Sequence, residues 1–80
     1  MGFFKAIKRV MSGSVVRQVD VLANGGMTTV SVRLKKNNAG EKFVVLAFIS
    51  TGNYQYCSMD TSEFRDLITA MHDVEKKIDI

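Results

Sequence analysis

Three glycine-containing turn signals divide this chain into short extended segments. They read ANGG (residues 23–26), NNAG (residues 37–40) and TGN (residues 51–53). Glycine and asparagine tolerate the positive φ angles that tight turns demand, so each signal is typical of a hairpin. The segments between these signals have the length of strands, and consecutive strands joined by short turns pair in antiparallel fashion. The turn spacing therefore predicts an antiparallel meander.

The residue pattern places four strands at about 15–22, 27–36, 43–49 and 54–59. The third reads FVVLAFI and is apolar on both parities, which predicts that both of its faces are covered. The second alternates between apolar and polar residues, as expected for a half-buried strand. The first is apolar on both parities, so its facing stays open. The fourth is shorter and leads directly into the last element.

That last element is a helix that begins near Asp60 or Thr61, where Asp60 and Glu63 have the spacing of a capping box. Its apolar side chains form one stripe: Phe64, Leu67, Ile68, Met71, Val74 and Ile78. A short amphipathic helix is also predicted within residues 1–12, ahead of a single domain at 13–80. The expected fold class is thus α+β, a four-stranded antiparallel meander followed by a C-terminal helix on one face.

Strand parity predicts what that helix covers, because neighbouring residues of a strand point to opposite faces. In the second strand, Val30, Val32 and Leu34 should face the helix, whereas Ser31, Arg33 and Lys35 should point the other way. In the fourth strand, Cys57 and Met59 lead into the helix cap, so we expect them in the core. Tyr54 and Tyr56 then fall beside Arg33 and Lys35.

The charge of the chain is unevenly distributed along the sequence. Residues 1–59 hold eight basic and two acidic side chains, whereas residues 60–80 hold three basic and six acidic ones. Such asymmetry favours a basic face that meets a polyanion, with an acidic element turned away from it. The alternative is two solvated surfaces that simply differ in charge.

Cations mixed with aromatic rings on one sheet face are typical of proteins that bind single-stranded nucleic acid. Basic side chains follow the phosphates, and exposed rings stack on unpaired bases. Tyrosines in strands also commonly just cover a sheet, which is the alternative interpretation. The candidate nucleic-acid-binding residues are Arg17, Arg33, Lys35, Lys42, Tyr54 and Tyr56.

No pattern in the sequence indicates catalysis, a metal or a cofactor. His72 is the single histidine and Cys57 the single cysteine, and neither has a partner at metal-ligand spacing. Cys57 also lacks a neighbouring base that could activate its thiol. We therefore expect a protein that is not an enzyme and that needs no cofactor.

Two stretches resemble a known family. Residues 30–33 (VSVR) and 58–67 (SMDTSEFRDL) are similar to the second strand and the strand-to-helix junction of the single-stranded DNA-binding domain of the coactivator called positive cofactor four. Pur and Whirly proteins are similar in topology. The resemblance implies a homodimer that packs its helices together and binds single-stranded DNA on curved sheets. It also implies that Arg33 holds a phosphate and that Phe64, Leu67, Met71 and Val74 form the dimer and core side of the helix.

The first hypothesis is therefore a non-catalytic, homodimeric protein that binds single-stranded DNA or RNA and acts inside the cell, in transcription or replication. An isolated 80-residue chain buries only about 60% of its unfolded surface, which also favours oligomerisation. A second hypothesis is a structural or adaptor subunit whose apolar third strand and residues 3–11 contact other proteins. A third is peripheral membrane attachment through residues 2–11, which is disfavoured because the segment is short.

Overall fold

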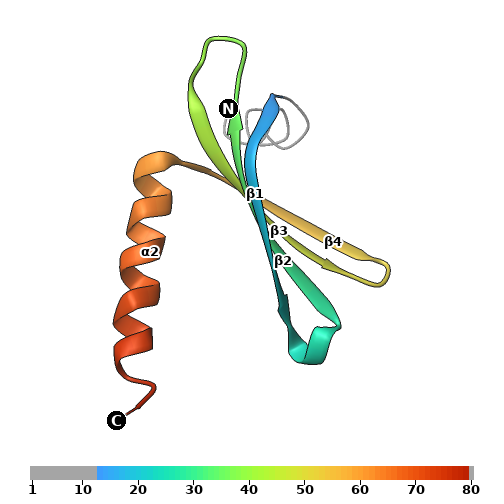
Figure 1. Ribbon diagram of the computed structural model, residues 1–80, viewed down its shortest axis with the longest axis vertical. Helices are drawn as coiled ribbons and strands as arrows, with labels where there is room; N and C mark the ends of the chain where they lie inside the picture. The colour runs from blue at the N-terminus through green and yellow to red at the C-terminus, as the bar shows by residue number, and fades with distance from the viewer. Residues whose placement is uncertain (1–12, 80) are drawn as a thin grey trace.

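The computed structural model describes residues 13–79 and shows one antiparallel sheet followed by a helix (Figure 1). The order of strands in the sheet is β1-β2-β3-β4, so every strand pairs with its neighbour in sequence. The elements are β1 (Ser14–Ala23), the 3-10 turn η1 (Asn24–Gly26), β2 (Thr28–Lys36), β3 (Lys42–Ser50), β4 (Asn53–Asp60) and α2 (Thr61–Lys76). The α+β meander predicted from the sequence is thus confirmed, while the helix predicted within residues 1–12 lies outside the described residues.

The predicted turns connect the strands where the sequence placed them. In the first hairpin, Asn24 and Gly25 have φ angles of 53° and 66°, the left-handed conformation that these residue types adopt most readily. In the second, the Asn37 side chain holds the turn: its Oδ1 accepts hydrogen bonds from the backbone N–H groups of Ala39 and Glu41, both at 2.9 Å. Local chemistry therefore accounts for the meander.

The register of the strands defines two faces of the sheet. On the face that α2 approaches, called here the helix face, Val32 lies opposite Leu46, which lies opposite Cys57. On the other face, Arg33 lies opposite Val45, and Tyr56 lies opposite Ala47. We call this second face the tyrosine face, because Tyr54 and Tyr56, which are two residues apart on β4, both point to it. The predicted facing of β2 and β4 is therefore confirmed.

The buried core is concentrated on β3. Its residues 43–47 are at most 7% exposed, and they belong alternately to the two faces. Because β3 is an interior strand, side chains of β2 and β4 flank it on both faces. The prediction that this apolar strand is covered on both sides holds for these five residues, but Phe48 on the helix face is 42% exposed.

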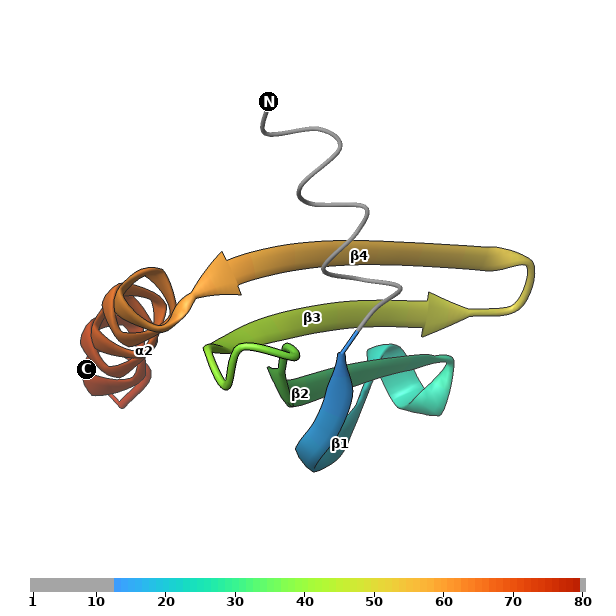
Figure 2. The same cartoon turned by 90° about the horizontal axis from the view of Figure 1, so that it is seen from above.

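Helix α2 begins at the predicted cap and then diverges from the sheet (Figures 1 and 2). A capping box joins Asp60 and Glu63, and the backbone N–H of Asp60 donates to Oε1 of Glu63 at 2.8 Å. No residue of α2 is buried, because only its first turns lie close to the sheet. For the same reason Met59 is half-buried and Cys57 is exposed, so the prediction that Cys57 lies in the core is wrong.

No helix within residues 13–79 combines the length and the apolar character that a membrane span requires.

Among the glycines of residues 13–79, Gly13, just before β1, is the one whose replacement should cost most. Its φ angle is +79°, and a Cβ atom there would lie 2.8 Å from the backbone oxygen of Lys36. Gly52 has a similar φ angle of +71° but open space around the same position. We expect Gly13→Ala to lower the free energy of unfolding by about 3 kcal/mol and Gly52→Ala by only about 1 kcal/mol. Urea titrations followed by circular dichroism test this difference, and equal losses would contradict it.

Candidate functional site

The tyrosine face presents two aromatic rings and one cation close together. Strand β4 places Tyr54 and Tyr56 two residues apart, so both point to the same side, and they are 64% and 44% exposed. The Arg33 guanidinium on β2 lies over the Tyr56 ring, with its Cζ 5.9 Å from the ring centroid. Since β3 lies between β2 and β4, this cation–π contact reaches across β3.

The Arg33 side chain is also held from its own strand. Its Nε donates a hydrogen bond to Oγ of Ser31 at 3.1 Å, and Ser31 is almost completely buried. A planar guanidinium fixed in this way presents its donors in a defined direction, which suits a phosphate better than a freely rotating side chain does.

Lys35 lies on the tyrosine face as predicted, but it is only 7% exposed. Its Nζ is 5.9 Å from the centroid of the Phe43 ring, which lies opposite it on β3. Burial, and secondarily the positive charge of Arg33, lower the pKa of Lys35 from its ordinary value of 10.5. Because so little of the residue is exposed, Lys35 is a poorer candidate for a direct phosphate contact than the sequence pattern indicated.

Two of the predicted site residues, Arg17 and Lys42, lie on the opposite side of the sheet. Arg17 pairs with Leu34 of the helix face, in the regular register that runs from the first hairpin up to the bulge between Val15 and Arg17. Lys42 shares the parity of Val44, which also belongs to that face. The grouping of both residues with Arg33 was therefore wrong.

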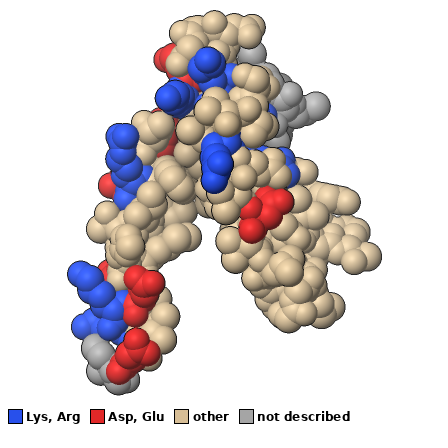
Figure 3. Space-filling model, viewed as in Figure 1, with Lys and Arg blue, Asp and Glu red and all other residues tan. Residues whose placement is uncertain are grey.

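On the helix face, Arg17 and Lys42 meet Arg65 from α2. The three line a cavity of about 470 Å³ whose remaining walls are mostly apolar. Figure 3 shows basic side chains over the end of the sheet nearest the start of α2, while the far end of α2 carries both signs of charge. The other lining residues are Val19, Val32, Leu34, Val44, Thr61, Phe64 and Ile68.

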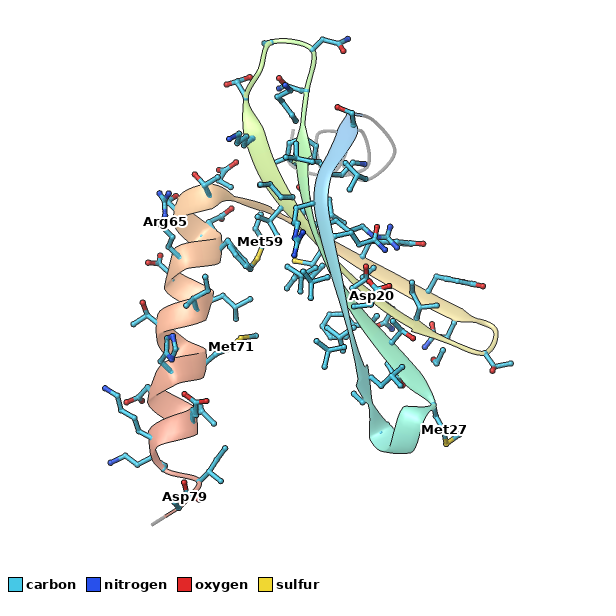
Figure 4. All side chains as sticks on the ribbon, in the orientation of Figure 1. Asp20, Met27, Met59, Arg65, Met71 and Asp79 are labelled. Carbon is cyan, nitrogen blue, oxygen red and sulfur yellow. The ribbon has the colours of Figure 1, made fainter. Side chains whose placement is uncertain are left out.

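The acidic residue Asp20 belongs to the tyrosine face and was missed by the sequence reasoning. Asp20 on β1 lies opposite Ser31, and its carboxylate accepts a hydrogen bond from Nε2 of Gln18 at 3.2 Å (Figure 4). The sequence did not place Asp20, because β1 has apolar residues on both of its sides and its pattern does not indicate which side faces the helix. A carboxylate here opposes the binding of a phosphate at Arg33.

The helix residues expected in a core differ in their surroundings. Phe64 and Leu67 are half-buried, whereas Met71 and Val74 are 57% and 66% exposed. Figure 4 shows Met71 on the side of α2 that is turned toward the sheet but well separated from it. The apolar stripe predicted from the sequence therefore exists, and most of it is left uncovered by the described part of the chain.

Within residues 13–79 there is no group of three or more His, Cys, Asp or Glu side chains arranged to hold a metal ion. His72 is an exposed side chain of α2, with its Nδ1 3.5 Å from Oε1 of Glu75. The thiol of Cys57 lies on the helix face of β4 and forms no disulfide.

No protein-family model matches the chain, and neither the curated proteins nor the solved structures include a significant match to it.

Proposed function

We propose that the protein binds single-stranded nucleic acid through the tyrosine face, as a non-catalytic homodimer. The observation that carries this proposal is the placement of Tyr54 and Tyr56, exposed on one side of β4, with Arg33 oriented over Tyr56. Exposed rings in a row offer stacking surfaces for successive unpaired bases, and a guanidinium beside them offers a phosphate contact. Double-stranded nucleic acid keeps its bases stacked on one another, so it would not use these rings.

The homodimer is proposed because a single chain leaves much apolar surface in water. On the helix face Val19, Val21 and Phe48 are all more than 40% exposed, and so are Met71 and Val74 of α2. Exposed apolar side chains gathered on one face of a sheet and along one side of a helix are typical of a protein–protein interface. A second copy that covers this surface would leave the tyrosine face free for nucleic acid.

Titration of the protein into a fluorescently labelled single-stranded oligonucleotide, followed by anisotropy, tests the proposal. Binding should weaken steeply with rising salt, because each neutralised phosphate releases counterions. A duplex of the same sequence serves as the control and should bind more weakly. If micromolar protein shows no binding to single strands at low salt, the proposal is wrong.

Removing the charge of Asp20 should strengthen nucleic acid binding. Its carboxylate lies on the tyrosine face near Arg33, and a unit charge about 8 Å away in water opposes a phosphate by roughly 0.5 kcal/mol. We therefore expect Asp20→Asn to raise affinity about twofold at low salt, with the gain disappearing at high salt. Asp66→Asn on the exposed surface of α2 is the matched control. An equal gain for both variants would point to net charge rather than to this face.

A further inference from the structure

The apolar stripe of α2 contains one acidic side chain. A groove along the helix is lined by Leu67, Ala70, Met71, Val74, Glu75 and Ile78. The other acid of this half of the helix lies elsewhere: Asp73 lines a separate hollow with Asp66, His72 and Lys76 on another side of α2. Any surface that covers the stripe must therefore be apolar and must also receive the Glu75 carboxylate.

The cavity on the helix face has the complementary composition. Its apolar walls come from the sheet and from the first turns of α2, and its charged members are Arg17, Lys42 and Arg65. None of its lining residues is acidic. Within residues 13–79 none of these three cations forms an ion pair, and all three are exposed. The cavity thus combines apolar surface with unneutralised positive charge.

The spacing of the stripe also suits pairing with a second copy of itself. Ile68 and Val74 are each three residues from Met71, and Phe64 and Ile78 are each seven residues from it. An antiparallel pair of α2 helices about a twofold axis at Met71 would therefore bring apolar residues together in both halves. In such a pair, the C-terminal half of one helix lies beside the N-terminal half of the other, which is where the cavity is found.

We propose that the cavity on the helix face receives the C-terminal half of α2 and the turn that follows it from a second copy of this chain, with Met71, Val74 and Ile78 against its apolar walls and Glu75 paired with Arg17 and Lys42. The contact is reciprocal, since each copy offers one cavity and one helix end. This contact specifies the interface of the homodimer proposed above. It does not require that the protein binds nucleic acid.

Charge reversal tests this interface without nucleic acid. Glu75→Lys and Arg17→Glu should each raise the dimer dissociation constant on the order of 100-fold, because each places like charges in both halves of the contact. Sedimentation velocity over a range of concentrations measures that constant. Asp73→Lys, with the same charge change on another side of α2, should leave the dissociation constant nearly unchanged.

An equimolar mixture of the Glu75→Lys and Arg17→Glu chains provides the decisive measurement. In the heterodimer one half of the contact joins the two substituted side chains, which again carry opposite charges, and the other half joins the unsubstituted Glu75 and Arg17. Dimerisation should therefore return to nearly the wild-type constant. Circular dichroism of each variant shows whether it is folded. A wild-type dimer that neither reversal weakens, or a mixture of folded variants that stays monomeric, would overturn the interface. A monomeric wild-type chain would overturn both the interface and the homodimer.

Discussion

The double substitution Tyr54→Ala/Tyr56→Ala is expected to lower the affinity for a single-stranded oligonucleotide on the order of 100-fold. Each base stacked on an aromatic ring contributes about 1–3 kcal/mol, and this variant removes both rings from the tyrosine face. Anisotropy titration at constant salt measures the loss. The chain should remain folded, because the two side chains are 64% and 44% exposed and neither belongs to the buried set on β3.

The matched control for this loss keeps the rings and removes only the hydroxyl groups. Tyr54→Phe/Tyr56→Phe should retain most of the affinity if the rings stack on bases, since phenylalanine offers the same flat surface. An equal loss in both double variants would show that the hydroxyl groups, and not the rings, make the contact. Unchanged affinity in the double alanine variant would exclude the tyrosine face as the binding surface.

The largest effect on stability is expected at Phe43. Its ring is 3% exposed and contacts the buried Lys35 side chain, so Phe43→Ala removes a large apolar group from the small core on β3. Such truncations cost about 3–5 kcal/mol, which is comparable to the entire stability of many domains of this size. We expect the variant to be largely unfolded at 25 °C, with lost cooperativity in urea titrations followed by circular dichroism.

Phe48→Ala is the control for the same chemical change on the same strand. Phe48 is 42% exposed on the helix face, so its truncation should cost clearly less than that of Phe43 in a single chain. A loss as large as that of Phe43→Ala would show that Phe48 is covered in solution. That outcome would support a second copy on the helix face rather than a change in the core.

Much of the fold could be predicted because it depends on local chemistry. The turns at residues 23–26, 37–40 and 51–53 need residues that accept positive φ angles or bond to their own backbone, and those residues are visible in the sequence. The capping box at Asp60 and Glu63 is equally local. Once the turns are placed, a meander follows, since short connections pair consecutive strands.

Part of the candidate site could be predicted for the same reason. Strand parity correctly placed Arg33, Tyr54 and Tyr56 on one face, because the alternation of side chains in β2 and β4 is a property of each strand alone. Parity could not place Arg17, because β1 is apolar on both parities and its pattern does not reveal which of its sides faces the helix. Asp20 was missed for the same reason, since it lies on the same strand.

The sequence by itself determined the strands, their turns, the helix start and the two-residue alternation that assigns Tyr54 and Tyr56 to the face of Arg33. Only the tertiary structure decided that Lys35 is buried, that Arg17 and Lys42 meet Arg65 around one cavity, and that α2 leaves its apolar stripe exposed. The physical reason is the distance along the sequence over which each kind of interaction acts. Turn and strand preferences act over a few neighbouring residues, whereas burial, bulged register and the angle of a helix depend on packing between segments that are distant in the sequence.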